Sequence, residues 1–222
     1  MGKISNGHDG AGVALPVNQG DTETHPWEPY VPDGARVLIM GTFPPKPHRW
    51  SMDFYYPNRT NDFWRVMGII YFNDPMALYD SENKRFRLDE IKRLLDREGI
   101  ALNDTGHRVR RLKDNASDKF LEIIEPVDLK GLLERMPCCD VVVTTGEKAA
   151  GVLAALTGTA VPKTGEFTDA LYEPLGRMLR IWRMPSTSRA YPLAPEKKAE
   201  FYKRMLDDVK SRHGQCGCGG KK

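Results

Sequence analysis

Residues 140–156 read DVVVTTGEKAAGVLAAL, and this stretch decides the fold class. Its first half is a short run of valines and threonines, which is typical of a strand buried in a parallel sheet. Its second half is rich in alanine, begins directly after Gly146 and predicts a helix that ends at Gly158. Because a buried strand that leads straight into a helix is half of a βαβ unit, the stretch predicts an α/β fold.

The same alternation of strand and helix runs through the rest of the chain. Further strands are predicted over residues 37–40, 99–102 and 178–184, and helices over residues 63–70, 88–97, 118–124, 127–135 and 195–210. Right-handed βαβ units then predict a single-domain αβα sandwich of three layers, with a central sheet of four mostly parallel strands. Since ligands bind such sheets at the carboxyl ends of the strands, the loops that follow the first and last predicted strands are the candidate ligand-binding loops.

The two ends of the chain differ in composition from this body. Residues 1–24 are rich in Gly, Asn and Asp without apolar periodicity, which predicts a flexible segment. Residues 213–222 consist mostly of Gly, Lys and Cys and predict a disordered tail, which leaves one domain over residues 25–212. Trp27 and Tyr30 are expected to attach the extended start of that domain to its body.

The composition excludes several classes of protein. Of the 222 residues, 40% are hydrophobic and 28% charged, as in a globular domain, and the net charge of +3 favours no class of partner. No apolar run approaches the roughly 18 residues of a membrane span, and no secretory signal is visible. We therefore expect an intracellular, cytoplasmic monomer, nucleoid-associated if bacterial. The cysteines, at 138, 139, 216 and 218, match neither a disulfide framework nor a zinc spacing and predict reduced thiols.

The loop after the first predicted strand reads Gly41-Thr42-Phe43-Pro44-Pro45. Its prolines restrict the backbone, and a stiff loop at a strand end can present its amides to a ligand. A structural turn has the same pattern, so both interpretations stay open. Neither GxGxxG nor GxxxxGK[ST] occurs, which leaves a dinucleotide or ATP site without support.

The loop after the last predicted strand contains small hydroxyl side chains and a cation, namely Ser186, Thr187, Ser188 and Arg189. Such a combination is suited to binding the phosphates of a DNA backbone. A serine hydrolase acting through Ser186 or Ser188 is a weaker hypothesis, because no GxSxG pattern surrounds the serines. The histidines of the folded middle, His48 and His107, are not paired with them by any motif.

Residues 54–64 read FYYPNRTNDFW and combine aromatic rings with Arg59 just before a predicted helix. An aromatic ring beside an arginine can stack on a nucleobase while the cation binds its phosphate. The two aromatic residues on the helix are expected in the core, whereas Tyr56, in the loop, suits either role. Asn61 is placed either to cap the helix or to act on a ligand.

Five motifs in this order resemble those of the uracil-DNA glycosylase superfamily, nearest its hypoxanthine (deoxyinosine) branch and its mismatch-specific thymine and uracil branch. The resemblance extends from His25 to the final helix. The motifs are GTFPP at residues 41–45, YYPNRTNDFW at 55–64, GIALND at 99–104, TGEKA at 145–149 and MPSTS at 184–188.

The resemblance implies a monofunctional enzyme that flips a damaged base out of single- or double-stranded DNA and hydrolyses its bond to deoxyribose, with no cofactor and no metal. The base pocket that it implies is formed by Gly41, Thr42, Phe43, Pro44 and Tyr56. The DNA-binding residues that it implies are Arg59, Pro185, Ser186, Thr187, Ser188 and Arg189. Of these, Arg189 is the wedge expected to fill the vacated stack.

The chain departs from the superfamily at two positions. Phe43 stands where the mismatch branch has a catalytic Asn and other branches an Asp, and Met184 stands where the most efficient uracil enzymes have a histidine. The hypoxanthine branch then implies that Asn61 positions the water or the sugar. Asp104, at the end of the second predicted strand, is our second catalytic candidate, for steering the water. The amides of Thr42 and Phe43 are expected to bind the leaving base. A catalytically impaired nucleic-acid-binding relative is the alternative, and Phe43 is the residue that supports it.

Overall fold

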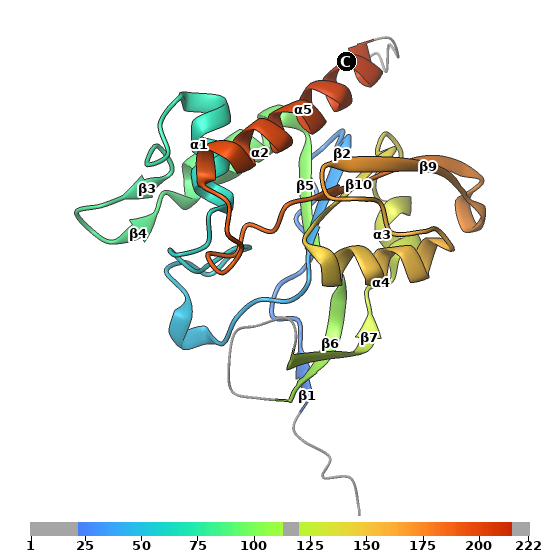
Figure 1. Ribbon diagram of the computed structural model, residues 1–222, viewed down its shortest axis with the longest axis horizontal. Helices are drawn as coiled ribbons and strands as arrows, with labels where there is room; N and C mark the ends of the chain where they lie inside the picture. Colours follow the sequence, from blue (N-terminus) through green and yellow to red (C-terminus); the bar gives the residue numbers. More distant parts are fainter. Residues whose placement is uncertain (1–21, 113–119, 215–222) are drawn as a thin grey trace, which may run out of the picture.

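The computed structural model describes residues 22–112 and 120–214. Its centre is a five-stranded sheet in the order β5, β2, β8, β10, β9 (Figure 1). The strands are β2 (Val37–Gly41), β5 (Ile100–Asp104), β8 (Val141–Thr145), β9 (Glu166–Tyr172) and β10 (Arg177–Met184). The first four strands in the sheet order pair in parallel, and β9 pairs antiparallel with β10 at one edge. The predicted α/β class with a mostly parallel sheet is confirmed.

The apolar runs explain why three of these strands lie in the middle of the molecule. Every residue of β2, β5 and β8 is buried. Successive side chains of a strand point to opposite faces, so Val37 and Ile39 enter one core while Leu38 and Met40 enter the other. A strand that is apolar at every position must be covered on both faces.

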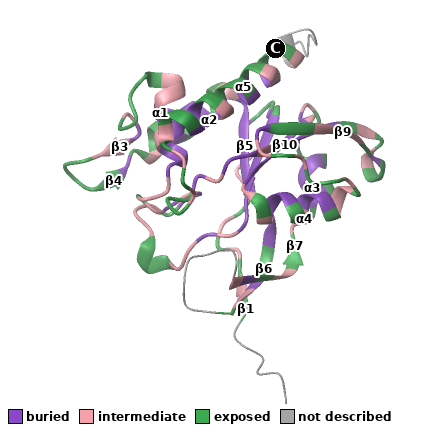
Figure 2. Ribbon diagram, in the orientation of Figure 1, coloured by how far each residue is buried: buried purple, intermediate pink, exposed green. Residues whose placement is uncertain are grey.

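Helices provide that cover on each side of the sheet. Buried residues of α1 (Phe63–Phe72), α2 (Leu88–Glu98) and α5 (Pro195–Gly214) belong to the first core. Those of α3 (Leu129–Glu134) and α4 (Glu147–Thr157) belong to the second. Figure 2 shows the buried residues concentrated on the central strands and on the inward sides of the helices.

The sheet has five strands, so the predicted number of four is wrong. The additional strand is β9, in which most residues are exposed or half-buried. Its pairing with β10 runs from Glu166 opposite Arg183 to Tyr172 opposite Arg177. An edge strand of this kind has a weak local signal, because its stability depends on the neighbour to which it pairs.

The helix predicted over residues 118–124 is also wrong. Leu121–Pro126 forms β7, which pairs antiparallel with β6 (Gly106–Arg111), and β6 pairs antiparallel with β1 (Thr22–Thr24). Apolar spacing in so short a run does not distinguish a strand from a helix, and pairing with distant residues decides the outcome. Residues 118 and 119 lie outside the described residues.

The ends of the folded chain differ slightly from the expected domain of residues 25–212. Thr22–Thr24 forms β1, so pairing begins within the segment expected to be flexible, and α5 continues to Gly214. The rest of both terminal segments lies outside the described residues, including the cysteines at 216 and 218.

The extended start of the domain is attached as expected. Tyr30 exchanges two backbone hydrogen bonds with Leu102, at 3.0 and 2.9 Å, and the Trp27 indole donates to Asp53 at 2.6 Å. Two short elements complete this side of the fold: the 3-10 helix η1 (Pro47–Arg49) and the hairpin of β3 (Tyr79–Asp80) and β4 (Arg85–Phe86) between α1 and α2. A further 3-10 helix, η3 (Glu173–Leu175), joins β9 to β10.

Two smaller expectations concern the cysteines and the helices. Neither Cys138 nor Cys139 forms a disulfide with another described residue, and burial raises the pKa of the Cys139 thiol to about 12. Within residues 22–112 and 120–214, no helix has both the length and the apolar character that a membrane span requires.

Candidate active site at the carboxyl edge of the central sheet

The two loops selected from the sequence meet in one cleft of about 710 Å³. Gly41, Asp104 and Thr145, which end three parallel strands, all line it. Most of the predicted site residues line it as well, namely Gly41, Thr42, Phe43, Pro44, Tyr56, Asn61, Asp104, Ser186, Thr187, Ser188 and Arg189. Residues that are far apart in the chain therefore face one space at the carboxyl edge of the sheet.

Two of the predicted residues lie elsewhere. Arg59 is exposed and lines a smaller neighbouring pocket. Pro185 is buried, and its carbonyl accepts a hydrogen bond from the Tyr202 hydroxyl at 3.1 Å. Pro185 thus anchors the loop to α5 and does not line the cleft.

Gly41 and Asp104 lie opposite each other at the ends of β2 and β5. A Cβ atom at residue 41 would lie 2.6 Å from Asp104 Oδ1, so only glycine leaves room for this carboxylate. The residues that follow β5 are bonded to the end of β2 and the loop after it, because Thr105 and Gly106 donate backbone hydrogen bonds to the carbonyls of Gly41 and Thr42 at 2.9 and 3.0 Å. Asp104, which is 7% exposed, is consequently held in one place on the wall of the cleft.

His25, to which no motif pointed, is the partner of Asp104. Its Nε2 lies 3.0 Å from Asp104 Oδ2, and the two side chains are 5% and 8% exposed. Its Nδ1 lies 2.9 Å from the Trp27 carbonyl oxygen and 3.2 Å from the Trp27 nitrogen. A protonated ring can donate to Asp104 and to the carbonyl, and a neutral ring can still donate to Asp104 while Nδ1 accepts from the Trp27 N–H.

The surroundings of His25 favour its protonated form. Burial by itself would lower the pKa of His25, but the hydrogen bond and the negative charge of Asp104 outweigh it, with further help from the Trp27 carbonyl and Glu28, and raise this pKa above its ordinary value of 6.5. The ring is also stacked on Tyr55, with centroids 5.7 Å apart.

The only sequence signal for this pair was the position of His25 close to Trp27, in the segment expected to attach to the body. The histidines that the sequence did suggest as bases, His48 and His107, do not line the cleft. His25 comes from outside the motifs and reaches Asp104 across 79 positions of the chain.

The contacts of Phe43 explain an aromatic residue at this position. Its ring meets the His25 ring edge-on at 5.4 Å, and the Arg111 guanidinium lies 5.6 Å from its centroid. Arg111 also donates to the Pro44 carbonyl at 2.7 Å and pairs with Glu23 at 2.7 Å. Phe43 therefore shields His25 from water, and Arg111 holds the loop that contains it.

Tyr56 is fixed through its backbone and its ring. Its φ of 53° lies in the left-handed region that residues with side chains rarely adopt. Its ring stacks on Phe63, with centroids 3.9 Å apart and planes at 15°, and its hydroxyl is hydrogen-bonded to the Thr145 hydroxyl at 3.1 Å. Because Phe63 covers one face of the ring, a base that enters the cleft can stack only on the other.

Asn61 contacts the start of α1 and also lines the cleft. Its Oδ1 accepts a hydrogen bond from the Phe63 N–H at 2.9 Å, whereas Asp62, the residue at the N-cap, makes no capping bond through its side chain. Since Oδ1 faces a donor, the amide NH2 is the group that remains for a ligand. Asn61 is thus suited to donate a hydrogen bond and unsuited to accept a proton.

A buried lysine holds the second loop from behind. Lys198 of α5 is 0% exposed, and its ammonium donates to Asp62 Oδ2 at 2.8 Å and to the Ser188 carbonyl at 3.1 Å. Asp62 in turn donates its N–H to the Thr187 carbonyl at 2.8 Å. The buried charges stabilise the loop backbone, while the side chains of Ser188 and Arg189 stay exposed.

The arrangement supports neither metal binding nor serine hydrolysis. Within the two described ranges, no group of three or more His, Cys, Asp or Glu side chains could hold a metal ion. Ser186 Oγ accepts a hydrogen bond from the Ser188 N–H at 3.2 Å, and the described residues that line the cleft include no histidine. A nucleophilic serine needs an adjacent base, so the cleft gives no support to the serine hydrolase hypothesis.

Comparison with known proteins supports the fold. No family model and no curated protein matches the chain. The structure is similar to the solution NMR structure of a protein from Methanosarcina acetivorans described as a "putative Uracil DNA glycosylase". The two chains share 21% sequence identity and a TM-score of 0.55, over 83% of this chain and 98% of that one. At this level of identity the similarity establishes a common fold.

Proposed function

From this common fold and the cleft at the edge of the sheet, we propose that the protein is a monofunctional DNA glycosylase of base excision repair. Its substrate is DNA in which a deaminated base, uracil or hypoxanthine, is flipped out of the helix. The convergence of Tyr56, Asn61 and Asp104 on one cleft of about 710 Å³ is the observation that supports this best. A cleft of this size can hold a nucleotide.

The flipped base stacks on the face of Tyr56 opposite Phe63, because Phe63 covers the other face. The backbone amides of Thr42 and Phe43 stabilise the negative charge that develops on the departing base, in the manner of an oxyanion hole. The restricted backbone of this loop and its bonds to Arg111 and to Gly106 support a fixed direction for those amides.

Asp104 takes the proton of the attacking water. The water oxygen forms a bond to C1′ of the sugar, the bond from C1′ to the base nitrogen breaks, and its electron pair leaves with the base. The water proton passes to Asp104, whose negative charge also stabilises the developing positive charge on the sugar. His25 occupies Oδ2 of Asp104, so Oδ1, which lies beside Gly41, is the oxygen that acts.

Asn61 acts beside Asp104 as a donor. An amide cannot take a proton from water, and its Oδ1 already accepts from Phe63. Its NH2 group therefore orients the water or the base. The position of Asn61 within Asn-x-Phe-Trp supports assignment to the hypoxanthine branch rather than the mismatch branch.

Water is the proposed nucleophile because no lysine is found among the described residues that line the cleft. An amine at this place would form a Schiff base with the sugar and cut the strand. The exposed Ser188 and Arg189 are proposed to bind phosphates and fill the vacated stack, with Arg59 nearby.

A panel of labelled duplexes tests this function. Each duplex holds uracil, hypoxanthine, xanthine or a mismatched thymine opposite each base, and alkali converts any released base into a strand break. Breaks at uracil or hypoxanthine are expected, and alkali must be needed for them. Binding of the duplexes without release in any arm would favour the catalytically impaired relative, for which the apolar side chain of Phe43 is the supporting observation.

A further inference from the structure

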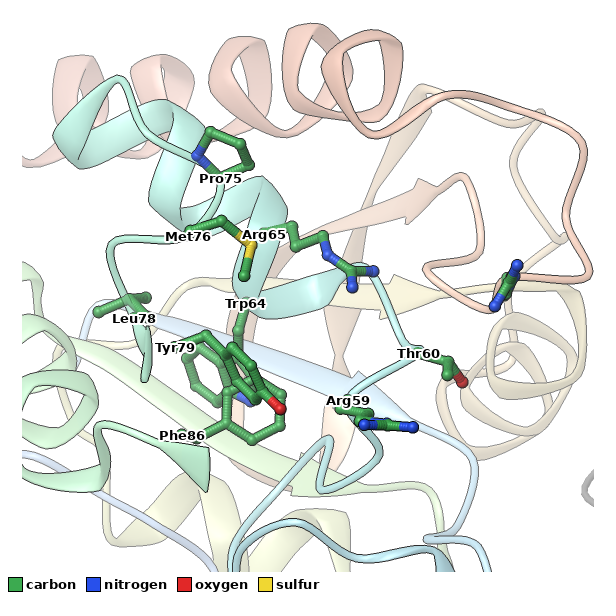
Figure 3. A pocket seen from close by; sticks show the side chains of 10 residues that line it. Arg59, Thr60, Trp64, Arg65, Pro75, Met76, Leu78, Tyr79 and Phe86 are labelled. Carbon is green, nitrogen blue, oxygen red and sulfur yellow. The ribbon is translucent and has the colours of Figure 1, made fainter. Parts of the chain in front are cut away.

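A second, smaller pocket of about 280 Å³ adjoins the cleft on the side of the β3–β4 hairpin (Figure 3). Thr60 and Arg189 line both spaces. The other residues that line it come from the loop before α1, the start of α1, the segment between α1 and β3, and the hairpin, and they include Arg59, Trp64, Arg65, Tyr79 and Phe86. A chain-like ligand that occupies the cleft can therefore continue past Thr60 and Arg189 into this second pocket.

Positive charge surrounds the second pocket without matching negative charge. Arg59 and Arg189 are exposed, and neither forms an ion pair with another residue of the described ranges. Arg65 is paired with Asp62 at 3.1 Å, but the same carboxylate also neutralises the buried Lys198. Three guanidinium groups with one shared carboxylate are suited to a phosphate, which accepts several hydrogen bonds.

An aromatic wall faces these cations. Figure 3 shows the rings of Tyr79, Phe86 and Trp64 grouped together, with the side chain of Arg59 beside them and that of Arg65 above. Phe86 and Trp64 are buried, at 7% and 1% exposure, whereas Tyr79 is half-buried and is held edge-on by Phe86 at 5.2 Å. Tyr79 is thus the ring of this group that a ligand can stack on.

We infer that the second pocket binds another nucleotide of the same DNA, with its phosphate on the arginines and its base against Tyr79. The inference rests on the proposed function, since the shared residues Thr60 and Arg189 make the two ligands neighbours. The nucleotide is either next to the flipped one or opposite it in the complementary strand. Both sources offer the same chemistry, a phosphate next to a flat ring.

The affinity of the protein for DNA tests the pocket. The probe is a fluorescent duplex with a tetrahydrofuran abasic site, which cannot be hydrolysed, and the same strand without its complement. Tyr79→Leu is expected to weaken binding about tenfold, as the loss of one stacked base does. Arg59→Gln is expected to weaken binding and to reduce the slope of log affinity against log salt by about one.

Arg59→Gln is expected to fold normally, because the side chain is exposed and makes no hydrogen bond or ion pair with another described residue. Its result therefore remains informative if Tyr79→Leu fails to fold. Arg93→Gln is its matched control, since Arg93 is 69% exposed on α2 and lines neither pocket. This control is expected to keep the salt slope of the original protein.

The fluorescence of 2-aminopurine identifies the strand. The probe base is placed on either side of the abasic site or opposite it, and binding is expected to change the signal at one of these places in the original protein but not in Tyr79→Leu. A change beside the site assigns the same strand, and a change opposite it assigns the complement.

Three results would overturn the inference. If DNA is bound but both variants keep the original affinity and salt slope, or no 2-aminopurine position responds to Tyr79, the second pocket takes no nucleotide, and the glycosylase proposal stands. If the protein binds no DNA at all, both proposals fail.

Discussion

The two walls of the cleft are built in opposite ways. At the ends of β2 and β5, the polar side chains of His25 and Asp104 are buried, paired and packed against aromatic rings. In the loop after β10, buried Lys198 fixes the backbone from behind, and the side chains of Ser188 and Arg189 are exposed. The first wall is organised to hold a charge at one point, as chemistry requires. The second wall is suited to the contact with a DNA backbone that we propose for it.

Asp104→Asn tests the buried wall most severely. An amide cannot take the water proton, so base release under single-turnover conditions is expected to fall by about 10²–10⁴-fold while the affinity for DNA stays within about twofold. Asn61→Ala is expected to lose less, since it removes a donor only. A larger loss in Asn61→Ala would assign the proton transfer away from Asp104.

Arg189→Gln in the same assay gives the comparison from the exposed wall. It is expected to reduce the affinity and the salt dependence of DNA binding, with a smaller effect on the rate of the bound complex. If Asp104→Asn and Arg189→Gln change the rate of base release and the affinity for DNA alike, the two walls do not have the separate roles proposed for them.

Lys198→Met tests how the exposed wall is held. Removing one partner of a buried ion pair leaves the other charge without compensation, and a loss of about 3 kcal/mol in the free energy of unfolding is expected. Arg65 still faces Asp62, which keeps the loss at the lower end of the usual range. Urea unfolding measures it.

Lys197→Met is the matched control on the same helix. Lys197 is 62% exposed and pairs with Glu200 at the surface, so its loss is expected to change the free energy of unfolding by less than about 0.5 kcal/mol. Equal stability of the two variants would mean that the buried pair does not hold the loop.

Gly41→Ala tests the space around Asp104. The new Cβ atom would lie 2.6 Å from Asp104 Oδ1, so the carboxylate must move, with an expected loss of about 1–3 kcal/mol in stability and at least about tenfold in base release. Gly151→Ala, in α4, meets no atom within 4 Å and is expected to raise stability by about 0.5–1 kcal/mol without changing activity. An active Gly41→Ala protein would show that the position of Oδ1 is unimportant.

The sequence predicted the parts of this cleft that depend on local patterns. The buried strands could be recognised from unbroken apolar runs, and the loops at their carboxyl ends were then certain to share an edge of the sheet. The pair of Lys198 and Asp62, 136 positions apart, could not be recognised, because a lysine in an amphipathic helix is normally exposed. The sheet of β1, β6 and β7 could not be predicted for a different reason, since β7 depends on its pairing with β6 rather than on its own residues.

The titration of His25 gives the smallest and most specific test of the buried wall. Its pKa in the folded protein is raised above 6.5, so folding favours the protonated ring. The stabilisation from this pair is therefore complete below pH 6.5 and is lost as the pH rises through the higher folded-state value. In urea unfolding, the original protein is expected to have a larger free energy of unfolding than His25→Asn. This difference is expected to be largest in acid and to shrink toward alkaline pH. His48→Asn, at an exposed position of η1 and outside this pair, is the control substitution.

The same titration separates the charge of His25 from its hydrogen bond. A neutral ring can still donate from Nε2 to Asp104, because Nδ1 can then accept from the Trp27 N–H at 3.2 Å. If this bond is what orients the carboxylate, base release by the original protein should persist over the pH range in which its difference in unfolding free energy from His25→Asn disappears. If base release falls together with this difference in unfolding free energy, the positive charge of His25 holds Asp104 in place. The buried wall would then depend on electrostatic attraction in the same way as Lys198 holds the exposed one.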